Sequence, residues 1–236
     1  MSLIRHKNVK WLLFFFLFYF LSVIKLHEYD RVPGPAHAEE LLYSWSGIYL
    51  IETGVPQSWS TLDYPKENLV YDGIVGDKNN VYLPAKLYRP WLDEPPLYSL
   101  LSGGAAHYFG DDKTKVLPVS HTRIPSVLAS LATMFLIFIA GLKFFDFNTG
   151  ILAMAVYGLS PIFVFGSRLS VPENIIALAL ISMLLLARKY LNIPDGYSRS
   201  DLIRPRVAGA THQINSAHVG ALLSQAKRGR GKGLTF

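Results

Sequence analysis

Residues 124–145 read IPSVLASLATMFLIFIAGLKFF, and this stretch decides the fold class. It matches the roughly 20 apolar residues that a helix needs to cross a bilayer. Three further apolar runs lie at residues 9–26, 149–166 and 174–189. Together the four runs predict an all-α integral membrane protein with about four transmembrane helices.

The first apolar run has two interpretations. Basic residues precede it (Arg5, Lys7 and Lys10), which is also typical of the start of a secretory signal peptide. However, Val23–His27 is bulky throughout and lacks the small residues of a cleavage site. We therefore expect an uncleaved helix, with the N-terminus in the cytoplasm because the basic residues precede it.

Charge is distributed unevenly along the chain. Residues 27–122 hold 13 acidic and 7 basic side chains, whereas residues 188–236 hold 2 acidic and 9 basic ones. The net charge of +6 is therefore poor evidence for a nucleic-acid partner, and opposite sides of a membrane explain the segregation better. Four crossings from a cytoplasmic start place residues 27–122 and 167–172 outside and the basic tail inside. The predicted location is the cytoplasmic membrane.

The outer loop, residues 27–122, has structure of its own. Apolar residues at helical spacing predict two short amphipathic helices, over residues 37–53 and 94–109, each ended by a glycine. Helices of this kind tend to lie flat in the membrane interface. A run of turn-forming residues between Ile74-Val75 and Val81-Tyr82 predicts a small hairpin.

The chain divides into a membrane region, residues 1–190, and a tail, residues 191–236. Ser, Gly, Ala, His and Arg dominate the tail, and no apolar run follows residue 190. We interpret it as a disordered basic tail, with an unrelated or frame-shifted terminus as the alternative. The chain has no cysteine, which excludes disulfides and Cys-based metal or nucleophile sites.

Charged residues gather at four places on the outward side. They are Glu39-Glu40 at a helix start, Asp93-Glu94 before Pro95-Pro96, Arg123 at the start of a span, and Arg168 with Glu173 between two spans. Each has a plain structural alternative, because acidic residues favour a helix N-terminus and arginines anchor helices at the interface. Their shared location is more informative than any one of them.

Carboxylates beside arginines suit chemistry on a lipid-linked phosphate. A carboxylate can take a proton from an attacking hydroxyl, while a cation neutralises the departing phosphate. If a divalent metal cation takes part, carboxylate oxygens would suffice as ligands, and Glu94 and Glu173 are the candidates.

Four motifs occur in a fixed order along the chain. They are Glu39-Glu40 with Tyr43, Asp93-Glu94-Pro95-Pro96-Leu97-Tyr98, Arg123-Ile124-Pro125-Ser126, and Arg168 with Glu173. In these places they resemble the GT-C glycosyltransferases that use polyprenyl- or dolichyl-phosphate sugars. The nearest group contains the protein O-mannosyltransferases and the lipid A aminoarabinose transferases. The resemblance covers about residues 8–190, the N-terminal portion of such an enzyme.

The resemblance implies an activity and roles for the motif residues. A hexosyl or pentosyl group would move from a polyprenyl- or dolichyl-phosphate carrier in the membrane to a hydroxyl of a glycan, lipid or protein acceptor on the outer face. Glu39 would be the general base, Glu40 a supporting group, and Glu173 a second acidic group near the acceptor or a metal. Arg123 and Arg168 would contact phosphate, and Asp93, Glu94 and Tyr43 would complete substrate binding.

Two positions depart from the family pattern. Glu39 stands where Asp is usual, so its carboxylate reaches one methylene further. Glu94 stands where Lys or His is common, which removes a phosphate-binding charge.

Two other functions stay open. Relatives carry many more spans, so a truncated, non-catalytic relative that binds polyprenyl lipid or acts as a scaffold is the main alternative. A transporter subunit is disfavoured, because the interiors of the runs hold essentially no ionisable residues.

Overall fold

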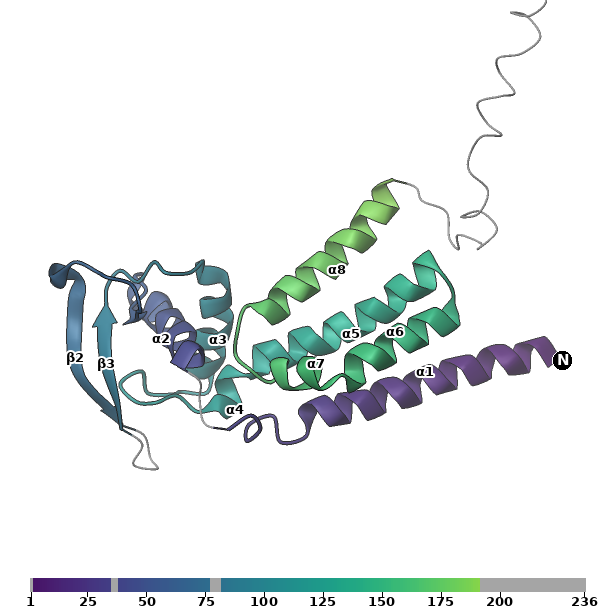
Figure 1. Cartoon of the computed structure of the whole chain (residues 1–236), viewed down its shortest axis with the longest axis horizontal. Coiled ribbons are helices and arrows are strands. Elements are labelled where there is room, and N and C mark those ends of the chain that lie inside the picture. Colours follow the sequence, from purple (N-terminus) through teal and green to yellow (C-terminus); the bar gives the residue numbers. More distant parts are fainter. Residues whose placement is uncertain (1, 35–37, 77–81, 192–236) are drawn as a thin grey trace, which may run out of the picture. The chain divides into compact units, whose positions relative to one another are not determined.

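The computed structural model describes residues 2–34, 38–76 and 82–191. The predicted tail, apart from Leu191, and the tip of the predicted hairpin lie outside these residues. The described residues belong to one compact body (Figure 1). It contains a group of long helices and a smaller part built from residues 27–122, which we call the outer unit.

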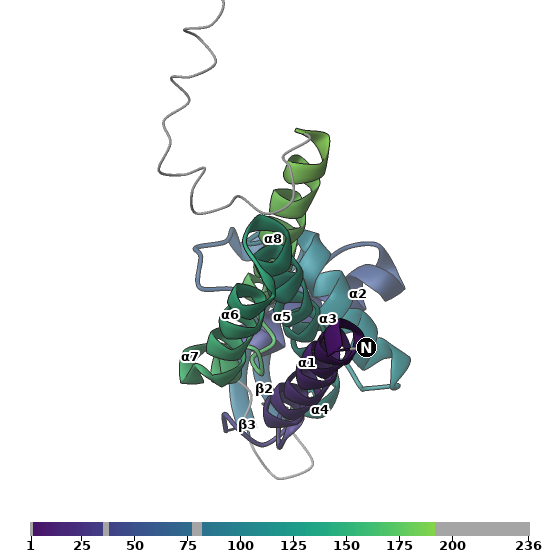
Figure 2. The same cartoon turned by 90° about the vertical axis from the view of Figure 1, so that its right-hand side faces the viewer.

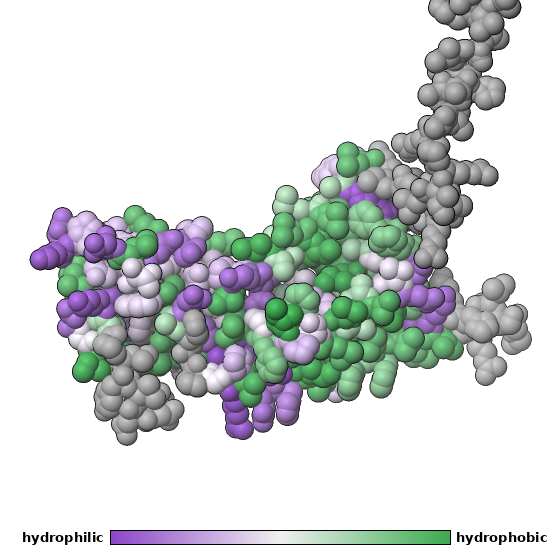
Figure 3. All heavy atoms as spheres, in the orientation of Figure 1, coloured by the Kyte–Doolittle hydropathy of each residue, from purple (hydrophilic) through white to green (hydrophobic). Residues whose placement is uncertain are grey.

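The long helices come from both ends of the described chain. They are α1 (Ser2–Leu26), α5 (Ile124–Phe144), α6 (Phe147–Leu159) and α8 (Glu173–Tyr190), and the short α7 (Pro161–Gly166) follows α6. Helix α5 packs against both α6 and α8, and α1 lies along α6, as the view along the helices shows (Figure 2). Figure 3 shows a predominantly hydrophobic surface over these helices and a mixed surface over the outer unit.

Two stretches within the described residues are long and apolar enough to cross a membrane, Asn8–Leu26 and Val119–Phe144. Helix α6 is a shorter apolar helix. These helices are compatible with a membrane protein, while the number of four spans stays a prediction.

Close packing holds these helices together. The rings of Phe14 on α1 and Phe138 on α5 stack with their centroids 4.2 Å apart, and both side chains are buried. Gly141 on α5 and Gly150 on α6 meet so closely that a Cβ on Gly141 would lie 2.5 Å from the Gly150 Cα. Because both positions lack a side chain, the two backbones can touch and their neighbours can interlock.

The third predicted run, residues 149–166, is not one continuous helix. Helix α6 ends at Leu159, Ser160 adopts an extended conformation, and α7 starts at Pro161. Proline lacks an N–H and its ring crowds the preceding turn, so it is tolerated at the first position of a helix but not inside one. The sequence prediction was therefore wrong in treating Pro161 as an interior residue of a single helix.

The outer unit contains two helices and a small sheet. Helix α2 (Ala38–Thr53) and α3 (Pro96–Tyr108) agree closely with the predicted helices, and positive φ angles at Gly54 (72°) and Gly110 (74°) accompany their ends. The strands are β1 (Ser58–Trp59), β2 (Leu69–Gly76) and β3 (Tyr82–Tyr88), in the antiparallel order β1-β3-β2. A short 3-10 helix (Lys66–Asn68) precedes β2, and α4 (Val119–Thr122) precedes α5.

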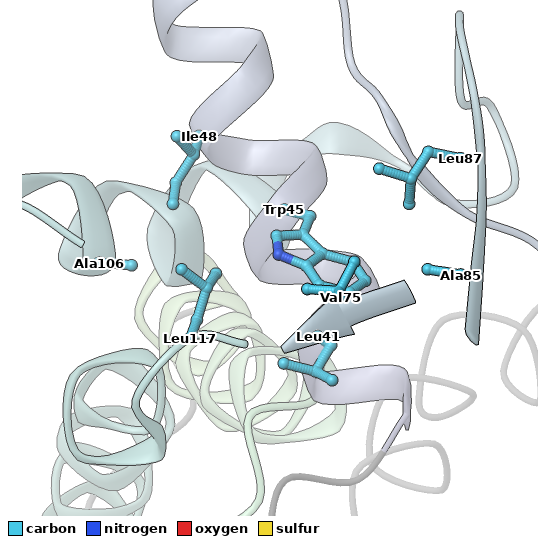
Figure 4. Close-up of a cluster of buried hydrophobic side chains, with 8 residues drawn as sticks. All are labelled: Leu41, Trp45, Ile48, Val75, Ala85, Leu87, Ala106 and Leu117. Carbon is cyan, nitrogen blue, oxygen red and sulfur yellow. The ribbon is translucent and has the colours of Figure 1, made fainter. Parts of the chain in front are cut away.

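The sheet differs from the all-α expectation, although the β2–β3 pairing confirms the predicted hairpin. Its inner face packs on α2 around Trp45, whose indole N–H donates to the Lys115 carbonyl (3.1 Å). Figure 4 shows this buried cluster, which contains Leu41, Trp45, Ile48, Val75, Ala85, Leu87, Ala106 and Leu117. The apolar side of α2 is thus covered by protein, whereas α3 exposes Leu97, Leu100, Leu101 and Tyr108.

Helices α2 and α3 cross at two glycines. A Cβ on Gly47 would lie 1.8 Å from the Ser99 carbonyl oxygen, and one on Gly103 would lie 2.5 Å from the Gly47 Cα. The contact brings the start of α2, with Glu39 and Glu40, against the start of α3, just after Asp93 and Glu94.

Candidate functional site

Glu40 forms a buried ion pair with Arg123. Its Oε1 accepts from the arginine Nε at 2.8 Å and its Oε2 accepts from Nη2 at 2.9 Å, and both side chains are almost completely buried. This two-pronged geometry matches the planar guanidinium to the carboxylate. The sequence predicted that these residues share one face of the membrane, and the structure shows them in direct contact.

The rest of the Arg123 guanidinium binds the segment after α1. Nη1 donates to the carbonyls of Tyr29 and Pro33, at 3.0 Å each, and Nη2 donates to the carbonyl of Gly34 at 3.2 Å. A guanidinium has five N–H donors, and all five therefore have acceptors within the protein. In this conformation Arg123 holds the start of α2 in place, and the phosphate contact implied for it stays a prediction.

Arg168 binds the end of α1. Its Nη2 donates to the Ile24 carbonyl at 2.7 Å, and Nε and Nη1 donate to the carbonyls of Lys25 and Val32 at 3.3 and 3.4 Å. The last carbonyls of a helix have no partner within the helix, and a cation is favourable there. The predicted phosphate contact of Arg168 also stays a prediction, since the structure places its side chain against α1.

Lys25 makes the complementary contact from α1. Its ammonium donates to the Phe163 carbonyl on α7 (2.9 Å) and lies over the Tyr157 ring, 4.6 Å from the centroid. The first helix is thus joined to the later helices by buried polar contacts, which is expected for a retained helix.

The charges of three acidic side chains act on the Tyr43 phenol. Burial, and then the charges of Glu94, Glu173 and Glu39, raise the pKa of the Tyr43 phenol to about 12. These three carboxylates come from different segments and are exposed, whereas Glu40 is buried. The structure thus separates the predicted acidic residues into one structural carboxylate and three accessible ones near one phenol.

Tyr43 belongs to a buried aromatic cluster. Its ring meets Trp91 and Tyr98 edge to face, with centroids 6.2 and 5.3 Å apart, and all three side chains are buried. Asp93 follows Trp91 by two residues, and its carboxylate accepts hydrogen bonds from the hydroxyls of Ser60 and Tyr64 (2.6 Å for Tyr64). Asp93 anchors the loop before α3 to the segment after β1.

Among the described residues, no group of three or more His, Asp or Glu side chains is arranged to hold a metal ion. The charges of Glu94 and Glu173, the pair named as metal ligands, both act on the Tyr43 phenol, and metal binding by them stays a prediction. We assign no chemical step to a metal.

A network of hydroxyls joins the four motifs. It links Tyr98 and Ser102 on α3 to Ser126 on α5, Ser44 on α2 and Ser170 in the loop before α8. The sequence analysis quoted Tyr98 and Ser126 within motifs without assigning them a role, and it missed Ser44, Ser102 and Ser170. Lone serines carry no periodic or charge signal, so only their spatial arrangement identifies them.

Residues 93–197 match the family model described as dolichyl-phosphate-mannose-protein mannosyltransferase. Over these residues the chain is similar to this GT-C glycosyltransferase family. The matched part of the chain starts at Asp93 and includes Arg123, Arg168 and Glu173. Glu39, Glu40 and Tyr43 precede it. No curated protein and no solved structure matched the chain.

The family match supports several of the coarser expectations. The description of the mannosyltransferase family implies a glycosyltransferase with a dolichyl-phosphate sugar as donor and a protein as acceptor. The resemblance to GT-C enzymes is thereby confirmed over residues 93–197, whereas the first motif, Glu39-Glu40 with Tyr43, lies outside the match. The individual residue roles stay predictions.

The Tyr43 phenol offers a direct test of the charges that act on it. Changing Glu94 to glutamine should lower the Tyr43 pKa from about 12 toward its ordinary value of 10.0, because one nearby negative charge is removed. The pKa can be followed by NMR of 13C-labelled tyrosine, with the signal assigned through Tyr43→Phe.

A matched control is Glu67→Gln, which removes an exposed carboxylate of the 3-10 helix and should leave the Tyr43 pKa unchanged. Since the folded-state pKa lies above the unfolded value, the phenol stabilises the fold below about pH 10, and this contribution is lost between about pH 10 and 12. An unaltered pKa in Glu94→Gln would show that the two groups are not close in the protein.

Proposed function

We propose that the chain transfers a sugar from a polyprenyl-phosphate carrier to an acceptor hydroxyl on the outer membrane face, with Glu39 as general base. The observation that supports this proposal most is that Glu39 is exposed next to the buried Glu40–Arg123 pair, while its charge and those of Glu94 and Glu173 act on the Tyr43 phenol. The family match supplies the class of donor.

The reaction needs one proton acceptor and a leaving group that departs with its negative charge. Glu39 accepts the proton of the acceptor hydroxyl, the oxygen attacks the anomeric carbon, and the bond from that carbon to the phosphate oxygen breaks. Attack from the face opposite the phosphate inverts the configuration at the sugar carbon. Glu39 suits the role of base because it is exposed, whereas both oxygens of Glu40 are occupied by Arg123.

The remaining side chains are assigned to binding and support. Tyr43 packs edge to face against Trp91, and its phenol stays protonated as a hydrogen-bond donor. Glu173 and Glu94 are assigned to acceptor binding, and their carboxylates would hold a divalent cation if one takes part. Arg123 and Arg168 fix the segments that carry these groups, and phosphate contact would require them to release protein carbonyls.

The proposal is tested by incubating the membrane-embedded chain with dolichyl-phosphate-[3H]mannose and a Ser/Thr-containing peptide. We expect label in the peptide. Binding of the carrier without transfer would instead support the non-catalytic, lipid-binding alternative. Since the chain lacks cysteine, single cysteines at positions 39 and 173 also report topology. Labelling of the two from opposite sides of the membrane would overturn the shared outer face.

A further inference from the structure

We propose that Ser170 is a positioning residue that sets the placement of Glu173 relative to Glu39. The inference rests on the proposed function for its catalytic meaning, while the contacts themselves are independent of it. Ser170 lies in the short connection between α7 and α8, is completely buried, and stands three residues before Glu173.

The backbone of Ser170 joins this connection to the Glu40–Arg123 pair. Its N–H donates to Oε1 of Glu40 at 2.7 Å, the same oxygen that accepts from Arg123 Nε. A hydrogen bond to a buried carboxylate is stronger than one between neutral groups. The buried pair at the start of α2 and the connection before α8 are therefore held together at a single carboxylate oxygen.

The hydroxyl of Ser170 lies within hydrogen-bond distance of three groups. It donates to the Thr122 carbonyl at 2.7 Å, and a carbonyl can only accept. The Tyr98 hydroxyl, 2.9 Å away, therefore donates to Ser170. The Ser102 hydroxyl, 2.8 Å away, has a single proton, which goes to Ser44 because the Ser44 proton goes to the Glu40 carbonyl.

The direction of these bonds continues outward from Ser170. Because Tyr98 donates to Ser170, it accepts from the Ser126 hydroxyl, 2.6 Å away. Burial raises the pKa of the Tyr98 phenol to about 12, so its proton stays available for this donation. The contacts thus join α2, α3, α4, α5 and the α7–α8 connection at one serine.

The path from Ser170 to Glu173 is short and stiff. Val171 donates its N–H to the Leu169 carbonyl at 3.0 Å, Pro172 directly precedes α8, and Glu173 is the first residue of that helix. The Asn174 side chain donates back to the Gly166 carbonyl at 3.1 Å. A change at Ser170 therefore moves the start of α8, and with it the Glu173 carboxylate, relative to α2.

Cysteines at positions 39 and 173 report the spacing of the two segments without any need for turnover. The chain has no native cysteine, so Glu39→Cys/Glu173→Cys is the only reactive pair. We expect Ser170→Ala to slow cross-linking of this pair by a short bifunctional thiosulfonate about five-fold, because a buried hydrogen bond contributes about 1 kcal/mol. Tyr98→Phe, which removes one donor to Ser170 and keeps the ring, should slow it less.

Ser182→Ala is the matched control, since the Ser182 hydroxyl bonds only within α8, to the Leu178 carbonyl. It should cross-link at the parent rate. In an otherwise unmodified active chain, Ser170→Ala should lower kcat with KM for the carrier unchanged, whereas general destabilisation would reduce both the folded fraction and carrier binding.

Parent-like cross-linking by both Ser170→Ala and Tyr98→Phe would overturn the proposal. If Ser170→Ala does not fold, Tyr98→Phe alone decides it. Absence of transfer by every version of the chain would count against the proposed function, and the cross-linking rates would still decide the role of Ser170.

Discussion

Changing Glu40 to glutamine should lower the free energy of unfolding by about 3–5 kcal/mol, the range found when one partner of a buried ion pair is removed. The substitution keeps the size of the side chain and removes its charge. Arg123, which is completely buried, then lacks its counter-charge, and one of its N–H groups or that of Ser170 faces an amide nitrogen in place of an oxygen. Denaturant titration of the detergent-solubilised chain measures the loss.

The neighbouring residue provides the control. Glu39 is exposed, so Glu39→Gln should change the free energy of unfolding by no more than about 0.5 kcal/mol. Equal stability of the two variants would show that the Glu40–Arg123 pair does not form in the membrane-embedded protein.

Changing Glu39 to glutamine should instead lower the turnover of sugar transfer about 10²- to 10⁴-fold, the usual contribution of a general base. The amide cannot accept the proton of the acceptor hydroxyl, while the shape of the site and the buried pair are retained. The measurement is the rate of label transfer from dolichyl-phosphate-[3H]mannose at saturating acceptor, with carrier binding determined in parallel.

Glu67→Gln is a suitable control for turnover, because it also removes one exposed carboxylate of the outer unit but not from the site. It should transfer at the rate of the unchanged chain. Parent-like turnover by Glu39→Gln would refute the base assignment, and a parallel loss of carrier binding would point to a role in substrate binding.

The two adjacent glutamates thus have opposite expected effects, one on stability and one on rate. Consecutive residues of a helix point about 100° apart, so only one of the two can face the protein interior. If Glu40→Gln were as stable as the unchanged chain but inactive, Glu40 and not Glu39 would be the general base.

Much of the fold follows from local signals in the sequence. The length of the apolar runs predicted α1 and α5, and glycines after an amphipathic pattern predicted the ends of α2 and α3. These features depend on residues a few positions apart, which the sequence displays directly. Pro161 is also a local signal, and its effect of ending the preceding helix was underestimated. A strand of two residues such as β1 is too short to give a periodic signal.

The sequence by itself determined that the chain has long apolar helices, an acidic loop over residues 27–122 and motifs that resemble those of the GT-C family, because each of these is a property of contiguous residues. Only the tertiary structure decided which carboxylates are structural and which are accessible. Glu40 is neutralised by Arg123, 83 positions away, and the hydroxyl that fixes Glu173 contacts helices 48 and 68 positions earlier. A buried polar group needs a partner wherever the chain can supply one, and sequence distance does not limit that choice.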